Sequence, residues 1–416
     1  MNMMKALTKP RPVMNEPWPI GLSLEEKPIP EVERDDQVKL EVVAAGICGT
    51  DVGIYHSKET LKVEMSRLKQ DSVIVGHEFC AEVADAGDIA RDTLARILYE
   101  KSKWMKQDYD LQQFITNHSL AEMANSPDLL PLIREKFYVT SEMHVICGVC
   151  HQCRTGNGHA CQNTIIKGLQ EDGAFAKYTV VPSSNITLIR KGDIQPEVIA
   201  FMDAFGNALH TVSSVNLLGK RVAVLGCGVQ GLMAIAIAKR AGASFIVATD
   251  VSNPAQGITR EKLEKTKFAI ARNVGADVCF DMGIEDSKAK LVETVMRETD
   301  NTGVDAVFEM SGSPFAYDDA LNIIRMGGTF SLLGIPSRQV QVDFANKVIF
   351  RGINIQAIIG RRMFETWETM ERILKSGMAD LMMENGFVSH VFPLEEFEKG
   401  FDAHEKGDAI KVVLKP

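Results

Sequence analysis

The sequence has no apolar run long enough to cross a bilayer. Its longest purely apolar runs, such as residues 232–238, are far shorter than the ~20 residues that a membrane-spanning helix needs. The first residues lack the apolar segment of a secretion signal. An excess of cations is also lacking, because the net charge is −9 and no basic stripe lies beside the cysteine-rich segment. These absences predict a soluble, cytoplasmic protein that binds neither membranes nor nucleic acids.

Cysteine is scarce outside one short segment. The chain has 8 cysteines in 416 residues, and four of them form a C-x₂-C-x₂-C-x₇-C run. This spacing lets a single loop wrap four thiolates around one Zn²⁺. We therefore predict a structural zinc site and a reducing compartment rather than a disulfide framework. A zinc ribbon of a nucleic-acid-binding protein is the alternative, which the acidic net charge disfavours. The predicted ligands are Cys147, Cys150, Cys153 and Cys161.

A glycine-rich turn follows the apolar run 221–225 and opens a helix-like stretch. Gly226, Gly228 and Gly231 have the spacing of a dinucleotide fingerprint in the strand-to-helix context that such a fingerprint needs. Alone, this motif is a weak signal, since a tight turn without a ligand has the same pattern. The next apolar run ends in Asp250, whose carboxylate could accept hydrogen bonds from ribose hydroxyls and repel a 2′-phosphate. The pair of signals predicts bound NAD rather than NADP.

The patterning changes along the chain. Residues 36–87 and 160–200 contain short β-branched runs punctuated by glycine, which is typical of a compact β domain. Beyond Gly219, strand-like runs alternate with longer helical stretches, which predicts βαβ units and a parallel sheet. The predicted strands of that sheet are 221–225, 245–249, 304–308 and 328–333. We expect an α/β protein whose nucleotide lies at the carboxyl edge of the sheet.

These patterns predict two domains. Residues 1–204 and 356–416 form a β-rich domain, and residues 205–355 form the nucleotide-binding domain. The tail at 409–414 should pair back onto the first domain.

A segment without glycine interrupts the β-rich domain. From about residue 88 to 137, apolar residues recur with helical spacing, which predicts a helical insertion of two helices. Two alternatives agree with this pattern. The insertion is a lid or a subunit contact, or it is a surface hairpin without a further role.

Two further motifs supply side chains that suit a catalytic metal. Cys48 lies in Ala-Gly-Ile-Cys-Gly-Thr-Asp, and His77 lies in Val-Gly-His-Glu. A thiolate and an imidazole hold catalytic zinc and leave a position open. Either residue alone would more often be an ordinary core or surface residue. Together, in this order, the C-G-T-D, the G-H-E, the four-cysteine lobe and the nucleotide motif resemble the zinc-dependent medium-chain dehydrogenases.

The resemblance covers nearly the whole chain apart from the insertion. It implies a GroES-like catalytic domain with a Rossmann domain, two zinc ions per chain, NAD, a small-molecule alcohol substrate and a homo-oligomer, either a tetramer or a dimer. It also implies that Cys48, His77 and Asp203 hold the catalytic zinc, with Glu78 either ligating the metal or exchanging with water.

The same resemblance suggests roles for other residues. Thr50 would contact the substrate oxygen, His144 would lie near the substrate, and Leu333 would contact the cofactor. The family's relay histidine is replaced by Gly53, so His56 is the candidate relay base. His144 has an equal alternative as a histidine that braces the zinc lobe.

Within this family, three stretches resemble the threonine-oxidising members: residues 203–211, 308–314 and 360–367. The implied reaction is zinc-assisted oxidation of L-threonine to 2-amino-3-oxobutanoate with hydride transfer to NAD. Two alternatives stay open at this point. One is a polyol or other secondary-alcohol dehydrogenase of the sorbitol or butanediol type, and the other is a protein that binds zinc and nucleotide without catalysis.

Overall fold

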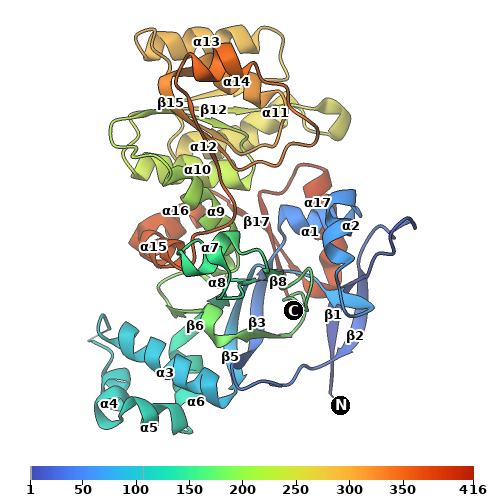
Figure 1. Ribbon diagram of the computed structural model, residues 1–416, viewed down its shortest axis with the longest axis vertical. Helices are drawn as coiled ribbons and strands as arrows, with labels where there is room; N and C mark the ends of the chain where they lie inside the picture. The colour runs from blue at the N-terminus through green and yellow to red at the C-terminus, as the bar shows by residue number, and fades with distance from the viewer. Residues whose placement is uncertain (1, 106) are drawn as a thin grey trace. The chain divides into compact units, whose positions relative to one another are not determined.

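A computed structural model describes residues 2–105 and 107–416, and its helices and strands are labelled in Figure 1. The chain divides into two compact units. Unit 1 comprises residues 1–202, 390–402 and 411–416, and unit 2 comprises residues 203–389 and 403–410. Among the described residues, none of the helices combines the length and the apolar character that a membrane span requires.

Unit 1 is built on β-sheets. The strand β3 (Gln37–Gly46) alternates buried and half-buried residues along most of its length, as expected where one face covers a core. It pairs with β5 (Phe79–Ala86), β9 (Tyr178–Pro182) and β18 (Lys411–Lys415), all antiparallel. The same sheet continues through β6 (Phe137–Ser141) and β10 (Ile186–Arg190) on one side and β17 (Val388–Pro393) on the other.

Smaller elements complete unit 1. A second sheet has the order β2-β1-β4, and two short antiparallel strands flank the cysteine-rich loop in the sequence. Their bounds are β1 (Met3–Pro10), β2 (Ser23–Pro28), β4 (Ser72–Ile74), β7 (His144–Val145) and β8 (Ile165–Ile166). The helices are α1 (Gly49–Tyr55), α2 (Glu59–Met65), α7 (His151–Arg154), α8 (Pro196–Ile199) and α17 (Phe397–Glu405), the last of which ends in unit 2.

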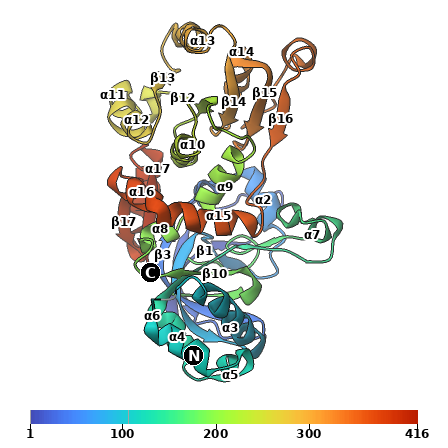
Figure 2. The same ribbon diagram turned by 90° about the vertical axis from the view of Figure 1, so that its left-hand side faces the viewer.

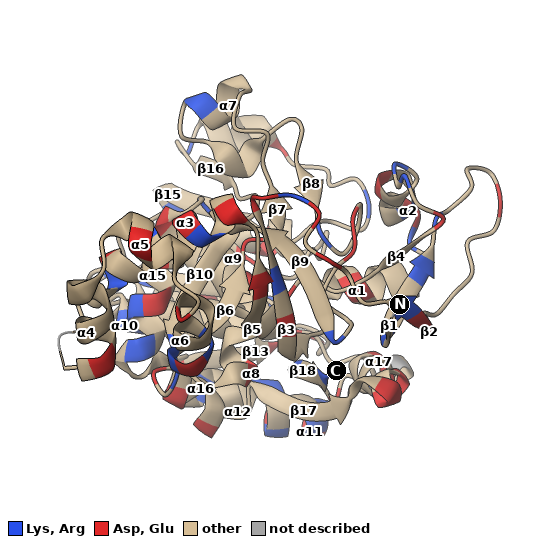
Figure 3. Ribbon diagram, turned by 90° about the horizontal axis from the view of Figure 1, so that it is seen from below, with Lys and Arg blue, Asp and Glu red and all other residues tan. Residues whose placement is uncertain are grey.

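The glycine-free segment is helical, as predicted, but it is divided more finely. Four helices lie together in Figure 2, namely α3 (Asp88–Ser102), α4 (Tyr109–Asn117), α5 (Leu120–Asn125) and α6 (Leu129–Lys136). The prediction of two helices was wrong, because Ser119 and Glu122 form a capping box that starts α5 and a further helix, α6, starts at Leu129. Basic and acidic positions are interspersed along this group of helices (Figure 3), as expected for solvated faces.

Unit 2 contains a parallel sheet with the order β13-β12-β11-β14-β15-β16 within the described residues. Its strands are β11 (Arg221–Leu225), β12 (Phe245–Asp250), β13 (Val278–Asp281), β14 (Val304–Glu309), β15 (Ile324–Leu332) and β16 (Asn354–Ala357). Starting from β11, the chain winds outward in both directions, which is the doubly wound order of a dinucleotide-binding sheet. The four predicted strands are confirmed, and β13 and β16 extend the sheet at its two edges.

Helices connect these strands and follow them. They are α9 (Met202–Val212), α10 (Val229–Arg240), α11 (Arg260–Leu263), α12 (Ala269–Asn273), α13 (Ser287–Glu298), α14 (Ala316–Ile323), α15 (Glu365–Ile373) and α16 (Ala379–Glu384). A π-helical turn, η4 (Glu264–Phe268), joins α11 to α12.

The return to the first unit lies later in the chain than the predicted boundary at residue 356. Residues 356–389 group with unit 2. The packing around α9 explains this, because a Cβ at Gly206 would meet Arg361 at 2.6 Å and Met370 at 2.9 Å. The predicted pairing of the tail is confirmed, since Val413 of β18 lies opposite Gly46 of β3.

Candidate active site and metal centres

The four cysteines of the lobe come together around one point. The Sγ atoms of Cys150 and Cys153 lie 3.5 Å apart, those of Cys150 and Cys161 3.9 Å apart, and those of Cys161 and Cys147 3.6 Å apart. Tetrahedral zinc with Zn–S bonds of about 2.3 Å requires S···S distances of roughly 3.8 Å. All four sulfurs lie within 4.8 Å of one another. The lobe therefore fits Zn²⁺ with a closed set of four thiolates.

Backbone amides around the lobe favour the charged form of its sulfurs. The amides of Cys147 and Asn163 each donate to Sγ of Cys161 at 3.4 Å. Hydrogen bonds from the amides of Val149 and Cys150 lower the pKa of the Cys147 thiol to about 6. Because the thiolate is the form of cysteine that binds metals, these backbone hydrogen bonds favour metal binding by the loop.

A second cluster lies elsewhere in unit 1. Cys48 directly precedes α1, whereas His77 and Glu78 lie in the turn that leads into β5. One ligand atom from each of the three residues lies within 4.8 Å of the others. His77 and Glu78 are buried and Cys48 is half-buried. The structure thus joins the C-G-T-D and G-H-E motifs, and it offers sulfur, nitrogen and oxygen donors of the types that catalytic zinc takes.

Asp51 orients the imidazole of this cluster. Its carboxylate is fully buried, accepts a hydrogen bond from the amide of Cys48 at 2.9 Å, and has Oδ1 3.4 Å from Nδ1 of His77. Although burial opposes protonation, Asp51 and Cys48 raise the pKa of His77 well above its ordinary value. With Nδ1 facing a carboxylate, Nε2 is the atom left to bind a metal, as in many zinc sites. The sequence reasoning had not singled out this residue.

Glu78 forms a buried ion pair with Lys411 of β18. The same ammonium donates to the carbonyl oxygen of Ile47 at 2.8 Å. Although burial opposes it, the Glu78 carboxylate raises the pKa of Lys411. Room for this pair depends on Gly46, because a Cβ there would lie 2.8 Å from Oε2 of Glu78 and 3.0 Å from Cε of Lys411. Lys411 was missed from the sequence, since it comes from the last strand and belongs to no motif.

The candidate proton-transfer residues lie on α1. Thr50 is in the first turn of the helix, next to Cys48, and is half-buried. His56 is the residue that ends the helix; it is also half-buried, and its ring meets the edge of Tyr55 at 5.3 Å between centroids. A Cβ at Gly53 would lie 2.6 Å from Cδ1 of Leu61, so a histidine at the usual relay position would require this side chain of α2 to move.

His144 is tied to a buried carboxylate. Its Nδ1 lies 2.8 Å from Oε1 of Glu142, and its backbone amide donates to the same oxygen at 3.0 Å. Glu142 has an exposed fraction of only 1%. This contact fixes the imidazole orientation, and it agrees with either of the two roles predicted for His144.

Asp203 lies in unit 2, near the start of α9. Its Oδ2 is 2.8 Å from Nη2 of Arg361, and both side chains are buried. Arg361 also donates to Oδ1 of Asn207 at 3.1 Å. The assignment of Asp203 as third zinc ligand stays a prediction, and in this unit the residue is the counterion of an arginine.

The glycine turn between β11 and α10 has the form that the motif predicts. Gly226 has a φ of 103°, which favours glycine, and a Cβ at Gly231 would lie 1.7 Å from the carbonyl oxygen of Gly226. Gly228 directly precedes α10, and a Cβ there would meet nothing within 4 Å. The open space at the helix N-terminus fits a pyrophosphate, which the helix dipole and free amides would hold.

Asp250 ends β12, as predicted, and it has a cationic partner. Its Oδ2 lies 3.0 Å from Nζ of Lys267 in η4. The segment that follows β12 thus brings a lysine to the predicted ribose carboxylate. Lys267 was missed from the sequence, because a π-helical turn cannot be recognised from residue spacing.

Leu333 follows β15, and its amide donates to the carbonyl oxygen of Glu309 at 3.0 Å. This contact places Leu333 at the carboxyl end of the sheet, the edge where a dinucleotide is expected. The carboxylate of Glu309 is buried there and accepts hydrogen bonds from the amides of Ser311 and Gly312. Burial raises the pKa of Glu309.

Two family models match the chain. Residues 34–95 match the alcohol dehydrogenase GroES-like domain, and residues 230–376 match the zinc-binding dehydrogenase domain. The L-threonine 3-dehydrogenase of Caldanaerobacter subterraneus subsp. tengcongensis is 37% identical over 95% of this chain and 96% of its own length. The L-threonine 3-dehydrogenase of Bacillus subtilis is 35% identical over 98% of this chain and 99% of its own length.

Solved structures with the same fold are more distant in sequence. An alcohol dehydrogenase from Thermus sp. ATN1 has a TM-score of 0.73 at 24% identity and covers 99% of both chains. A zinc-binding dehydrogenase from Sinorhizobium meliloti 1021, bound to NADP, has a TM-score of 0.73 at 24% identity and covers 100% of both chains.

Proposed function

The chain is an oxidoreductase of the zinc-binding dehydrogenase family, and we propose that it oxidises the secondary hydroxyl of L-threonine with NAD as hydride acceptor. Relatives named L-threonine 3-dehydrogenase, similar along nearly the whole chain, support the choice of substrate. The observation that carries the proposal is the cluster of Cys48, His77 and Glu78, which supplies a mixed donor set for a catalytic metal.

Different residues are proposed to bind the metal and to position its ligands. Cys48 and His77, together with Asp203 as we propose, would hold a zinc ion, which when bound would act as a Lewis acid on the substrate hydroxyl. Asp51 holds the imidazole of His77 in the orientation that a ligand needs. Lys411 neutralises Glu78, so that this buried carboxylate can lie beside the metal ligands without an uncompensated charge.

Thr50 and His56 are proposed to move the proton. The hydroxyl of Thr50, in the first turn of α1, would accept the proton of the substrate hydroxyl while it passes its own proton along the helix to His56. His144, held by Glu142, is proposed to contact the amino or carboxylate group of the substrate.

Binding of NAD is proposed at the turn that contains Gly226, Gly228 and Gly231, with Asp250 at the ribose and Leu333 near the cofactor. The carboxylate favours NAD, and its ion pair with Lys267 predicts that the discrimination against NADP is moderate rather than complete. A second zinc ion in the four-cysteine lobe and assembly into a homo-oligomer belong to the same proposal.

The test is a substrate panel on the zinc-loaded chain. We expect NADH production with L-threonine, and at least tenfold lower kcat/KM with sorbitol and with 2,3-butanediol. Metal analysis should give two zinc ions per chain. A higher kcat/KM on either polyol would overturn the choice of substrate, and one zinc ion per chain without turnover on any alcohol would overturn the catalytic proposal.

A further inference from the structure

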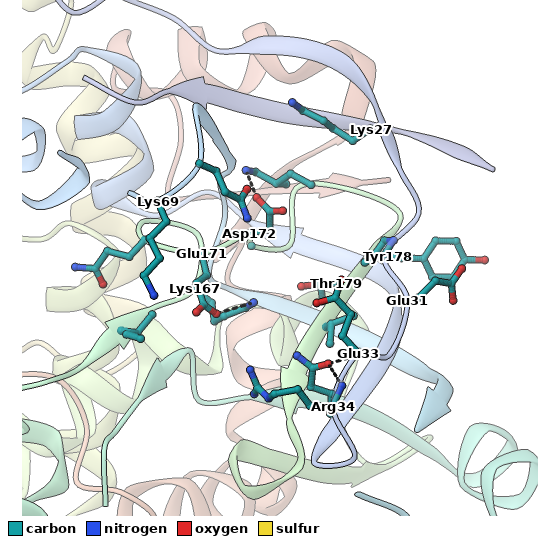
Figure 4. Close-up of a pocket in the computed structure, with 18 of the residues that line it drawn as sticks. Lys27, Glu31, Glu33, Arg34, Lys69, Lys167, Glu171, Asp172, Tyr178 and Thr179 are labelled. Atoms are coloured by element: carbon teal, nitrogen blue, oxygen red, sulfur yellow. Dashed lines mark hydrogen bonds and ion pairs between the residues drawn. The ribbon is translucent and has the colours of Figure 1, made fainter. Parts of the chain in front are cut away.

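Unit 1 has a cavity of about 760 Å³ that the proposed reaction does not use. It lies between the β1-β2 ribbon, the start of β3, β9 and the loop that follows the zinc lobe (Figure 4). None of its lining residues belongs to either cysteine cluster. Segments far apart in the sequence therefore build a second hollow in this unit.

A buried lysine lies in the wall of this cavity. Lys167 has an exposed fraction of 9%, and the acceptor that the described residues offer its ammonium is Oε2 of Glu171 at 3.4 Å. Figure 4 shows these two side chains facing each other. The side chain of Glu171 is 46% exposed, so solvent weakens its attraction for the lysine. An ammonium has three N–H donors, and a single long contact leaves donors available to a ligand.

The electrostatics around Lys167 agree with this geometry. Burial lowers the pKa of Lys167, although Glu171 and Asp172 raise it, and the nearby guanidinium of Arg34 lowers it further. Arg34 is thus close enough for the two cations to repel each other. An anion bound between them would relieve both the repulsion and the cost of burying the ammonium.

A second donor in the cavity wall has no partner. The hydroxyl of Thr179 on β9 is 2% exposed, and within the described residues its Oγ1 makes no hydrogen bond. Buried hydroxyls in folded proteins are nearly always hydrogen-bonded, so this one indicates an acceptor supplied by a bound molecule. Two buried residues with unused donors, one of them cationic, therefore belong to the wall of the same cavity.

The charge of the lining limits what can bind. Five lysine or arginine residues and four aspartate or glutamate residues line the cavity, which leaves one positive charge in excess. Three of the five cations are also paired with carboxylates outside the lining, namely Lys27 with Glu25 at 3.1 Å, Arg34 with Asp36 at 2.9 Å and Arg67 with Glu64 at 3.1 Å. A single negative charge is balanced here, whereas a doubly charged phosphate would face uncompensated repulsion from the acidic residues.

We propose that this cavity binds a small monocarboxylate, whose oxygens accept hydrogen bonds from Nζ of Lys167 and Oγ1 of Thr179. Binding here is separate from the oxidation of the alcohol and does not rest on the proposed function.

The test is calorimetric titration of the zinc-loaded full chain with propionate as the probe. Lys167→Met removes the charge at similar volume, and Thr179→Val removes the hydroxyl at similar shape. We expect the first to weaken binding at least tenfold and the second about threefold to tenfold, as for a charged and a neutral hydrogen bond. Lys167→Arg should retain most of the affinity. Lys177→Met, on a residue adjacent to the cavity that does not line it, is the matched control and should bind as the native chain does.

Two further arms separate this site from the catalytic metal and from phosphate binding. Cys48→Ser lacks a proposed zinc ligand and should still bind propionate, whereas neither Lys167→Met nor Thr179→Val should change kcat on L-threonine. Inorganic phosphate should bind more weakly than propionate. The proposal would be overturned if propionate bound equally to the native chain, Lys167→Met and Thr179→Val, or if it did not bind to the native chain at all. Loss of propionate binding in Cys48→Ser, or tighter binding of phosphate than of propionate, would also overturn it. Because Thr179→Val tests the same site, it decides the matter if Lys167→Met fails to fold.

Discussion

The two units assemble their chemical groups in different ways. In unit 1, the cluster of Cys48 and His77 is completed by Lys411, which comes from the far end of the chain. In unit 2, the proposed phosphate-binding turn lies within one continuous strand, turn and helix, from Arg221 to Arg240. The first depends on side chains that only the tertiary fold brings together. The second depends on backbone conformation that neighbouring residues specify.

This difference predicts how each unit responds to substitution. Removing one side chain from unit 1 should eliminate a chemical function while the sheets that carry it remain. Adding one methyl group to the turn of unit 2 should instead change the backbone itself. Metal content and nucleotide affinity are separate measurements, so each prediction can be assigned to one unit.

The largest effect is expected from Cys48→Ser. A serine hydroxyl is a poor zinc ligand at neutral pH, so the catalytic metal should be lost and kcat on L-threonine should fall by at least ~10³-fold. One zinc ion per chain should remain in the four-cysteine lobe, and NADH binding to unit 2 should be unchanged. Metal analysis, fluorescence titration of NADH and steady-state kinetics give the three readouts.

Cys279→Ser is the matched control, because Cys279 is a half-buried cysteine of unit 2 outside both clusters. It should retain two zinc ions and nearly full activity. Retention of full activity and of two zinc ions by Cys48→Ser would contradict the assignment of the catalytic centre.

Gly231→Ala should have the next largest effect. Its Cβ would lie 1.7 Å from the carbonyl oxygen of Gly226, so the turn must open and the amides must move away from the pyrophosphate. We expect NADH affinity to fall by about 100-fold, with the zinc content unchanged. Calorimetric or fluorescence titration measures the affinity.

Gly228→Ala provides the comparison within the same turn. A Cβ at Gly228 meets no protein atom within 4 Å, and the N-cap position has a φ of −67°. The free energy of unfolding should therefore stay close to that of the native chain, while it falls for Gly231→Ala. Equal loss of stability in both variants would show that crowding against Gly226 is not the cause.

The contrast between the units also explains what could be predicted from the sequence. The turn of Gly226 to Gly231, its flanking strand and Asp250 were predicted because each is specified within a short segment. The lobe was predicted for the same reason, since four cysteines in fifteen residues leave few other arrangements. In unit 1, Cys48 and His77 were linked only through a resemblance, as no local pattern joins residues 29 positions apart.

The residues that were missed are those whose partners are distant or irregularly placed. Lys411 meets Glu78 through strand pairing of the tail, and Lys267 meets Asp250 through a π-helical turn. Thr179 is another example, because its missing partner can be recognised only once burial is known. The division of the insertion into short helices was missed as well, since Ser119 acts as a cap although the apolar spacing continues past it.

A smaller effect is expected at the proposed ribose carboxylate, Asp250. Asp250→Ala removes a charge that repels a 2′-phosphate, so the preference for NAD over NADP should fall by about tenfold. Lys267→Ala should act in the opposite direction, because it removes the cation that neutralises Asp250 and could attract the phosphate. The ratio of kcat/KM for the two cofactors is the measurement. A shift of both variants in the same direction would contradict the proposed roles.

The smallest effect concerns an exposed ion pair of unit 2, which contrasts with the buried pair of Glu78 and Lys411 in unit 1. Asp318 lies between Lys288 and Lys347, whose hydrogen bonds lower the pKa of the carboxyl to about 2. A lowered pKa stabilises the fold above the pKa of the unfolded state, about 3.9, and this contribution is lost as the pH falls through about 2. Because the side chain is 49% exposed, solvent screening limits its contribution to at most ~1 kcal/mol.

Asp318→Asn should therefore lower the free energy of unfolding slightly at pH 6, and by roughly half as much at pH 3. Urea titrations of the variant and the native chain at both pH values measure the difference, and comparing the two chains at each pH cancels the titration of the other carboxyls. The measurement on Asp318 thus gives a reference value for the contribution of a solvent-exposed ion pair to the free energy of unfolding of this protein. If the difference grew on acidification, the two lysines would not be the groups that lower the pKa of Asp318.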